Sequence, residues 1–590
     1  WITGLIRHEK NSWVDVETGE QVSDAEIAPR YRQQIMDCTG IRFIKPETVG
    51  FDTKNVETWV IGYLDKPFHF MVGSKSEAED YCKADPEKIS MALVDGEWRI
   101  SLQAGAQIRL PKNVEFTRHV GGVVPDGLDF TKYGIPSDML ESVDRVTLFN
   151  LIATVDAWIS AGLTPEELMT HIHPTRIGNT QSSGIGGMRS LKKLYTDPVL
   201  GAERQNDILQ ETLLNVMAAY VVQSYVGSYG PMSHPVGACA TAALSIESGM
   251  EKILLGKADF VVTGGFDDIG IEGMYGFGDM NATAPTQDML DKGFEPKEFS
   301  RSNDIRRGGF VEAQGGGTVL LARGDVALRL GLPVYGVLGY AGSFSDGIHR
   351  SIPAPGKGLL AMALGKEQSV LSDALSGYGL SCDDIGVVYK HDTSTTANDV
   401  NENEIHHRIQ DHLERTNGNP LWVVSQKTIT GHSKGGAAAW QVIGLCQALN
   451  TQRIPGNKNL ACVDPTMKAY RHMCFTNQDV YFSADVPLKS GLVTSLGFGH
   501  VSAGLLVIHP DAFINAIPVD KQEAYRLQAN QRKRFADYHW EDIKMGNAQA
   551  FNRVQNRRFI NKDGSNKQNE EECSMLLDPS SRLIDGVFSS

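Results

Sequence analysis

Cysteine is scarce in this 590-residue sequence, and its eight cysteines are not arranged in pairs. No two of them have the CxxC spacing that is typical of zinc sites and redox-active dithiols. A disulfide framework is not indicated either, because such frameworks belong to short secreted chains that are dense in cysteine. We therefore expect reduced thiols in a cytoplasmic protein, where a single cysteine can have a chemical role.

Long apolar runs and an excess of positive charge are also missing. No stretch approaches the roughly 18–20 apolar residues that span a bilayer, and the sequence from Trp1 onward lacks the pattern of a secretory signal. The formal net charge of −15 argues against nucleic acid as a partner, because phosphate binding requires clustered Lys and Arg. The sequence thus predicts no membrane and no nucleic acid.

What is present is the composition of a soluble globular protein, with 41% hydrophobic and 22% charged residues. Residues 1–100 mix short alternating runs with charged turns and carry no catalytic signature. From about 175 to 510, short apolar runs such as 260–265 and 385–389 end in loops, with helical segments between them, which predicts an α/β fold. The polar, helix-prone tail at 511–590 is interpreted as a peripheral extension.

Cys239 lies in a segment that opens a predicted helix. Residues 235–243 read Pro-Val-Gly-Ala-Cys-Ala-Thr-Ala-Ala, and the helix is expected to run to about Leu255 and to end at Gly256. A helix N-terminus favours thiolate and lowers a thiol pKa, and the small neighbours leave room for a reacting group. An inert buried cysteine is the commoner alternative for a cysteine considered alone.

Two histidines follow separate predicted strands. His391 comes directly after the strand 385–389, and three hydroxyl residues follow it closely. His432 lies in a loop after the strand 421–424, five residues beyond Lys427, and this loop opens a Gly/Ala-rich helix. A single histidine is more often structural, and a lysine is more often a surface ion-pair partner. Two such loops together with the cysteine helix make coincidence improbable and predict a Cys–His–His site.

Residues 491–500 form a predicted strand that feeds the hinge Gly497-Phe498-Gly499. Glycines permit backbone conformations that bring the chain close to a ligand, and Phe498 can then act as an apolar door. A simple tight turn is the alternative. His406, His407 and His412 lie on a predicted polar helix and are interpreted as structural.

Metal binding by His391 and His432 is the main chemical rival to this site. No third His, Asp or Glu stands at a convincing spacing beside them, so we expect no metal.

Together these motifs resemble those of β-ketoacyl synthases, which have the thiolase-like fold. The resemblance spans roughly residues 100–510, and its motifs are 237–242, 391–395, 427–435 and 497–499. More narrowly, the sequence is similar to the synthase region of fungal and actinobacterial type I fatty acid synthases. The stretches that carry this second likeness are 126–136, 182–188, 264–283, 308–317 and 351–358. An actinobacterial relative is favoured, because no phosphopantetheinyl transferase region follows.

This resemblance implies an architecture and a set of partners. We expect two similar α/β halves at 101–345 and 346–510, an N-terminal linking or scaffold segment at 1–100, and a C-terminal helical tail at 511–590. The expected assembly is a homodimer within a larger homo-oligomer. The expected partners are an acyl carrier protein domain and other fatty acid synthase domains, with a ketoacyl reductase upstream. No cofactor is bound directly, since the 4′-phosphopantetheine belongs to the carrier domain.

The resemblance also assigns roles to the site residues. Cys239 takes up the acyl group, and His391 and His432 assist the decarboxylation of a malonyl thioester. Lys427 is expected to hold the second histidine loop and to raise the local positive potential. Three further roles are implied: an oxyanion hole from the N–H groups of Cys239 and Phe498, a gate at Gly497, Phe498 and Gly499, and pantetheine binding by Thr393 and Thr395. Arg189, Lys192 and Lys193 are candidates for carrier docking, with a solvated surface as the alternative.

Three positions depart from the family pattern. Asp392 and His500 stand where glycine is common, and Gln441 replaces a glutamate that usually pairs the lysine. Rival functions are a thiolase or type III starter-unit synthase, a non-catalytic synthase-like scaffold or chain-length subunit, and a secreted Cys/His protease. The Lys427–His432 loop argues against the first, the retained Cys239 against the second, and the missing signal against the third.

Overall fold

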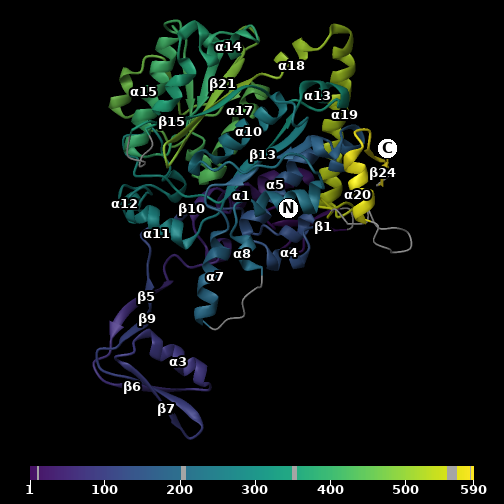
Figure 1. Cartoon of the computed structure of the whole chain (residues 1–590). Helices are drawn as coiled ribbons and strands as arrows, with labels where there is room; N and C mark the ends of the chain where they lie inside the picture. Colours follow the sequence, from purple (N-terminus) through teal and green to yellow (C-terminus); the bar gives the residue numbers. More distant parts are fainter. Residues whose placement is uncertain (10–11, 201–206, 349–354, 554–567, 585–586, 590) are drawn as a thin grey trace. The chain divides into compact units, whose positions relative to one another are not determined.

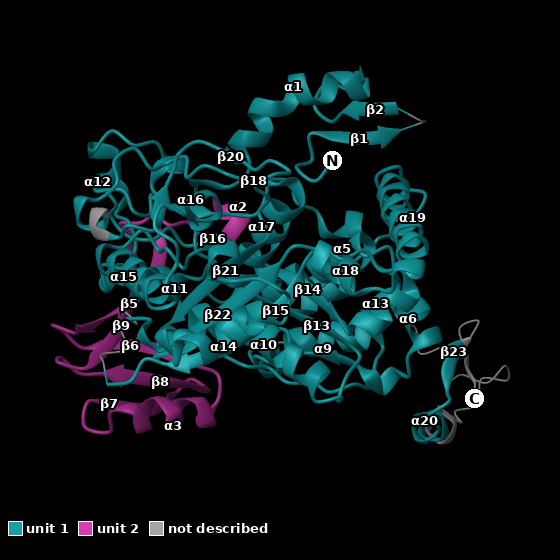
Figure 2. Ribbon diagram, turned by 90° about the horizontal axis from the view of Figure 1, so that it is seen from above, with its two compact units in different colours: residues 1–44, 120–590 teal, residues 45–119 magenta. Residues whose placement is uncertain are grey.

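The computed structural model describes the chain except residues 10–11, 201–206, 349–354, 554–567, 585–586 and 590 (Figure 1). It has two compact units, which are residues 1–44 with 120–590, and residues 45–119 (Figure 2). The predicted segment 1–100 is therefore divided between them. The four predicted domain bounds remain predictions.

The smaller unit is a β-rich module with one long helix. Strands β5 (Val56–Tyr63) and β9 (Gln107–Val114) form an antiparallel ribbon. A separate sheet has the order β6-β8-β7, formed by Phe68–Val72, Glu97–Leu102 and Ile89–Val94. Helix α3 (Lys75–Ala84) begins at Ser74, whose side chain accepts from Glu77 N, and packs on this sheet around Ala78 and Ile100. The short helix α2 is Pro46–Val49.

The first half of the larger unit is built on strand β13 (Phe260–Asp267), which is buried along its whole length. Strands β11 (Ile177–Asn179) and β12 (Ser182–Ser183) run parallel to it, and β14 (Gly315–Ala322) runs antiparallel. Its nearly continuous apolar sequence is typical of a strand covered on both faces, here by α5 (Arg145–Ser160) and α10 (Thr241–Leu254).

The second half repeats this plan with a six-stranded sheet of order β15-β22-β21-β16-β17-β19. Strands β16, β17, β19 and β21 are parallel, whereas β22 pairs antiparallel with β21 and β15. The strands are Val337–Ser345, Ile385–Tyr389, Leu421–Val424, Met473–Phe475, Ser490–Gly497 and Val501–Ile508 in chain order. Helices α15 (Thr396–His412), α17 (Ala437–Thr451) and α14 (Val370–Ser376) accompany them. The predicted α/β fold of two halves is confirmed.

Helices α10 and α17 bring the two halves together. Their first turns carry alanines that pack in one core, including Ala242, Ala243, Ala438 and Ala439. Small side chains allow this close approach, so the N-terminal ends of both helices meet in the interior. The predicted cysteine and histidine segments directly precede these two ends.

The remaining elements surround the two sheets. The tail helix α19 (Val519–Lys544) packs on the first half, where Arg532 donates to the carbonyls of Gly162 and Leu330 and pairs with Glu167. The other elements are β1 Ile6–Glu9, β2 Ser12–Asp15, β3 Gln21–Val22, α1 Asp24–Asp37, β4 Ile41–Phe43, β10 Val120–Gly122, α4 Ser137–Ser142, α6 Pro165–His171, α7 Met188–Leu200, α8 Ile208–Glu211, α9 Val216–Val221, α11 Ile271–Asp279, α12 Thr286–Asp291, α13 Gly324–Leu330, α16 Lys427–Thr430, β18 Arg453–Ile454, β20 Val480–Tyr481, α18 Asp511–Ala516, α20 Gln568–Leu577, β23 Arg582–Ile584 and β24 Val587–Ser589.

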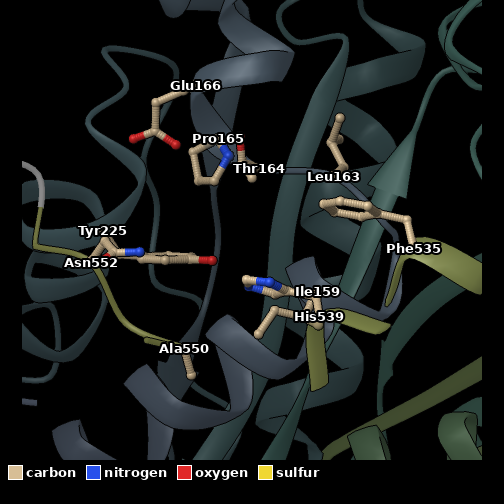
Figure 3. A pocket seen from close by; sticks show the side chains of 10 residues that line it. All are labelled: Ile159, Leu163, Thr164, Pro165, Glu166, Tyr225, Phe535, His539, Ala550 and Asn552. Atoms are coloured by element: carbon tan, nitrogen blue, oxygen red, sulfur yellow. The ribbon is translucent and has the colours of Figure 1, made fainter. Parts of the chain in front are cut away.

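No single helix among the described residues is long and apolar enough to cross a membrane; α5 and α6 reach that length and composition only together, with a bend of 57°. Between α6, α19 and residue 550 lies a cavity of about 230 Å³, lined by Leu163, Tyr225 and His539 among others (Figure 3). None of the predicted site residues lines it.

Candidate active site

Cys239 occupies a tight turn between the two halves. It lies in the 3₁₀ turn Ala238–Ala240 that leads into α10, and Ala238 has a left-handed φ of 48°. Thr241 Oγ1 donates to Ala238 O at 2.8 Å and accepts from Gly237 N at 3.1 Å. From the second half, Ser495 Oγ donates to Cys239 O at 3.0 Å. These bonds fix the backbone of the buried cysteine against strand β21.

His391 and His432 meet Cys239 in space. His391 directly follows β16, and His432 lies between α16 and α17. Their ring centroids are 5.2 Å apart with the rings at 86° to one another. One ligand atom from each of the three side chains lies within 4.8 Å of the others, and all three are buried. The predicted convergence is confirmed, whereas the catalytic roles stay predictions.

Both imidazoles are uncharged in this setting. Burial lowers the pKa of His391 and of His432 well below the usual value, and the nearby charge of Lys427 lowers both further. A neutral imidazole offers one N–H donor and one lone pair. The backbone N of His432 donates to Val311 O at 2.7 Å. Its ring Nδ1 is buried without a hydrogen-bond partner among the described residues.

The environment of Cys239 corrects the expectation of a lowered thiol pKa. Burial raises the pKa of Cys239 to about 11, and the charge of Lys427 opposes this only partly. Desolvation therefore outweighs the effect of the helix N-terminus. At neutral pH the side chain is a thiol, so its reaction requires a base. The imidazole of His432 is the nearest candidate, because Lys427 lies against the lone pair of His391 Nδ1.

Lys427 lies against the first histidine loop, although the sequence predicted that it holds the second. Its Nζ donates to His391 O and is 3.3 Å from His391 Nδ1. When Lys427 donates a hydrogen bond to Nδ1, the single ring hydrogen of the neutral His391 lies on Nε2. Burial lowers the pKa of Lys427 to about 8, while the negative charge of Glu402 raises it. The lysine thus links the two histidine loops and orients His391.

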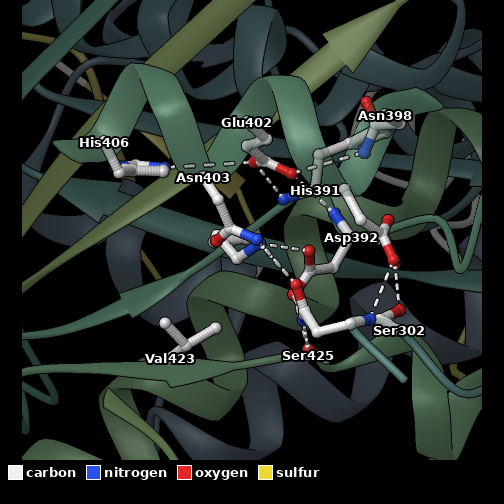
Figure 4. Close-up of polar contacts among 12 residues, drawn as sticks. Ser302, His391, Asp392, Asn398, Glu402, Asn403, His406, Val423 and Ser425 are labelled. Atoms are coloured by element: carbon white, nitrogen blue, oxygen red, sulfur yellow. Dashed lines mark hydrogen bonds and ion pairs between the residues drawn. The ribbon is translucent and has the colours of Figure 1, made fainter. Parts of the chain in front are cut away.

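Glu402 is a site residue that the sequence did not reveal. Its side chain is fully buried on α15, and its two oxygens accept from His391 N at 2.6 Å and from Asp392 N at 2.9 Å (Figure 4). Oε1 also accepts from Thr494 Oγ1 at 2.6 Å. Burial raises the pKa of this carboxyl, whereas Lys390 lowers it. Glu402 therefore anchors the His391 loop and supplies a negative charge near Lys427.

His406 lies one turn further along the same helix face. It is fully buried, its Nε2 is 3.1 Å from Thr494 Oγ1, and burial lowers its pKa to about 3. Asn398, Glu402 and His406 recur at intervals of four residues. A buried polar stripe of this kind was the available signal for Glu402.

Gln441 occupies the position where a lysine-pairing glutamate was expected from the family pattern. It is fully buried, and its Nε2 donates to Lys390 O at 2.6 Å, to Tyr389 O at 3.0 Å and to Thr494 O at 3.2 Å. The amide therefore joins the ends of β16 and β21. The carboxylate near Lys427 comes from Glu402 instead.

Asp392, where glycine is common, has a structural explanation. Its φ of 36° is left-handed, a conformation that glycine adopts freely and aspartate tolerates. Oδ1 is 2.5 Å from Lys390 Nζ, and Oδ2 accepts from Ser425 Oγ at 2.5 Å and from Asn303 Nδ2 at 2.9 Å. This buried network connects the His391 loop to Ser425 at the end of β17 and to the loop that contains Asn303.

The predicted pantetheine residues have internal contacts. Thr393 Oγ1 and Thr395 Oγ1 lie 3.0 Å apart, and Thr395 caps α15 by accepting from Asn398 N at 3.3 Å. The cap accounts for Thr395 in the folded chain, and pantetheine binding stays a prediction for both. The docking roles of Arg189, Lys192 and Lys193 on α7 also stay predictions.

The hinge 497–499 touches the cysteine turn. A Cβ placed on Gly497 would lie 2.0 Å from Gly237 O, so the backbones meet there. Gly499 has a φ of 88° and His500 a φ of 66°. A series of aromatic rings connects Phe498 of the hinge to His432. The distances between ring centroids are 6.2 Å from Phe498 to Phe277, 5.3 Å from Phe277 to Phe310, and 5.2 Å from Phe310 to His432.

A second buried charge cluster borders the cysteine. Lys434, two residues after His432, pairs with Glu312 at 3.1 Å, and Asp267 Oδ2 accepts from Gly435 N at 2.6 Å. No sequence motif pointed to a role for these residues. Cys239, His391 and His432 also form a three-residue group of the kind that can hold a metal ion, and the expectation of no metal stays a prediction.

Comparisons with known proteins agree with this geometry. The family model of the β-ketoacyl synthase N-terminal domain matches residues 83–327, and that of the C-terminal domain matches residues 335–461. The fatty acid synthase alpha subunit stcJ of Emericella nidulans is 39% identical over 99% of this chain and 37% of its own length. The fatty acid synthase subunit alpha of Saccharomyces cerevisiae is 31% identical over 99% of this chain and 35% of its own length.

The chain thus spans little more than a third of the length of these relatives, which are fungal and not of the actinobacterial kind that the sequence favoured. Among solved structures, the noncanonical ketosynthase FabY from P. aeruginosa superimposes with a TM-score of 0.81 at 22% identity, covering 92% of this chain and 85% of that one. This likeness shows a common fold.

Proposed function

Since the chain belongs to the β-ketoacyl synthase family, we propose that it lengthens acyl chains by condensing a malonyl thioester with an acyl group held on Cys239. The observation that carries this proposal is the meeting of one thiol and two neutral imidazoles within 4.8 Å in the interior of the protein.

In the first half-reaction, the sulfur of Cys239 attacks the thioester carbonyl of an acyl carrier. The new carbon–sulfur bond forms, the bond to the pantetheine sulfur breaks, and the thiol proton passes through an imidazole to the departing thiol. A base is needed, because burial keeps Cys239 protonated with a pKa of about 11. N–H groups of Cys239 and Phe498 would hold the oxyanion.

In the second half-reaction, a malonyl carrier loses carbon dioxide. Its carboxyl-bearing carbon–carbon bond breaks, and the N–H donors of His391 and His432 stabilise the enolate oxygen. Each such donor contributes about 3–4 kcal/mol when its removal slows the reaction a hundred- to thousandfold. The enolate carbon then attacks the acyl-Cys239 carbonyl, the bond to sulfur breaks, and the released thiolate takes a proton from solvent water. The products are a β-ketoacyl carrier and carbon dioxide.

The cationic Lys427 supports these steps through His391. By donating to Nδ1, it keeps the hydrogen on Nε2, where it can serve the enolate. Thr393 and Thr395 border the same loop and are proposed to receive the pantetheine arm. Neither half-reaction needs a metal or redox cofactor.

The wider context is proposed from the relatives. As part of a multifunctional fatty acid synthase, the chain would receive both substrates on the 4′-phosphopantetheine of an acyl carrier protein domain. A ketoacyl reductase domain would consume the product. We further propose a homodimer within a larger homo-oligomer and a cytoplasmic location.

Two substitutions test the proposal. Cys239→Ala should abolish condensation, because no atom remains to carry the acyl group. Cys239→Gln should retain malonyl decarboxylation, because its neutral amide resembles the acylated cysteine. Condensation and carbon dioxide release are measured separately with acyl- and malonyl-carrier substrates. Condensation by Cys239→Ala at the wild-type rate would remove the proposed nucleophile.

A further inference from the structure

Strand β5, which pairs with β9 in the 45–119 unit (Figure 2), carries a row of exposed apolar side chains. Trp59, Ile61 and Tyr63 alternate along β5 and so lie on one face. They are 43%, 60% and 70% exposed. None of them belongs to the core of the unit, which contains Val72, Ala78, Ile100, Leu102 and Ala106.

The same three residues form an open strand edge. Leu64 N donates to Ala106 O at 3.0 Å across the ribbon, which sets the alternation of its ladder. Backbone groups of even-numbered β5 residues therefore point toward β9, and those of Trp59, Ile61 and Tyr63 point away from it. Among the described residues, β5 pairs with no strand except β9.

The opposite edge of the ribbon is blocked. Pro111 on β9 lies opposite Trp59, so its nitrogen, which has no hydrogen, is on the outer side of the ribbon. Arg109 and Lys112 lie beside it. Proline and charge are the usual protection of an edge strand against further pairing. On β5, Glu57 is the only charged residue.

We infer that β5 pairs antiparallel with β5 of a second copy of this chain, which gives a four-stranded sheet of order β9-β5-β5-β9. A two-fold axis at Val60 sets Trp59 of each copy beside Ile61 of the other and joins their apolar side chains. The blocked β9 edges then lie outside, so the pairing closes at two copies and does not propagate.

A second copy fits this edge better than an unrelated strand, because the edge is complementary to itself and nearly uncharged. An isolated two-stranded ribbon is marginally stable in water, and additional strands stabilise it. Stable interfaces bury about 800 Å² on each partner, which is more than one strand edge provides. The ribbon is therefore expected to strengthen an assembly that has other contacts.

Cross-linking tests the axis. In the full-length chain, Val60→Cys places two thiols at the two-fold axis, where Cα atoms of a non-hydrogen-bonded pair lie about 4.5 Å apart and a disulfide can form. Mild oxidation should give a linked dimer, and peptide mapping should show residue 60 joined to itself. Leu110→Cys is the control, because Leu110 lies opposite Val60 on β9 and has a similar exposure, 44% for Leu110 and 38% for Val60. This control should not form a linked dimer. No link at residue 60, or equal yields from both variants, would overturn the inference.

Self-association gives a second test. Ile61→Lys places a charge on the open edge and should weaken self-association at least tenfold in sedimentation experiments. Leu93→Lys on β7 is the matched control, because Leu93 is 61% exposed and Ile61 60%. The control should associate like wild type. Unchanged association of Ile61→Lys would contradict the pairing. Condensing activity should persist in both, so a failure of the proposed function is detected separately.

Discussion

Glu402 offers a sharp test of how the His391 loop is held. Its two carboxylate oxygens accept from His391 N and Asp392 N, and its side chain is fully buried. In Glu402→Gln, one of these two N–H groups must face an amide NH₂ instead of an oxygen. An unsatisfied buried donor costs about 1–3 kcal/mol, so the free energy of unfolding should fall by that amount.

The same change removes the negative charge that raises the pKa of Lys427. The lysine should then lose its proton at a lower pH than in the wild type, and the alkaline limb of malonyl decarboxylation should move to lower pH with it. Denaturant unfolding measures the first effect, and a pH–rate profile of carbon dioxide release measures the second. A purely structural role for Glu402 would leave the pH profile where it was.

Glu404→Gln is the matched control on the same helix. Glu404 is a surface residue that pairs with Arg408, and such pairs contribute little to stability. The control should therefore keep wild-type stability and pH dependence. Wild-type stability in Glu402→Gln, or an unmoved alkaline limb, would refute this account of the loop.

Three further outcomes are expected. The pKa of Lys427 is lowered to about 8, so the lysine loses its charge above that pH and the rate of decarboxylation should decline. The free energy of unfolding should rise between about pH 8 and 10.5, because in that range the unfolded chain binds a proton that the folded chain does not. A decarboxylation rate that stays flat to about pH 9.5 would contradict this assignment. In Gly497→Ala, the new Cβ would lie 2.0 Å from Gly237 O, so the hinge must move. The free energy of unfolding should fall by about 1–3 kcal/mol and condensation should slow. Wild-type stability and activity in this variant would disprove the backbone contact. Asp392→Gly leaves the buried Lys390 without its carboxylate partner and should lower the free energy of unfolding by about 3–5 kcal/mol. Adding Lys390→Met should restore much of this stability. Additive losses in this double-mutant cycle would argue against the ion pair.

The residues that sequence patterns placed correctly share one feature. His391 follows a buried strand, His432 follows a strand and a short helix, and Cys239 starts a helix. Ends of strands and starts of helices are visible in a sequence as changes of hydrophobic periodicity, so these three positions could be predicted. Their convergence follows because parallel strands in each half end at the same side of the sheet.

What the patterns missed depends on burial. Glu402 and His406 lie on a helix whose sequence looks solvated, because the face that packs inward is itself polar. For Cys239, the helix N-terminus predicted a low pKa, but the size of the opposing desolvation depends on the full enclosure of the thiol. Lys427 was placed in the site, yet its contact with His391 depends on how two distant loops cross. Contacts of this kind are set by tertiary packing.

Trapping the acyl-enzyme shows whether Cys239 carries the growing acyl chain. The full-length chain is incubated with an acyl-carrier thioester, digested, and analysed by mass spectrometry, before and after malonyl-carrier is added. We predict one acyl group on the peptide containing Cys239, lost on malonyl addition with release of carbon dioxide. An acyl group that instead resides on the exposed Cys462, or that survives malonyl addition, would contradict the account.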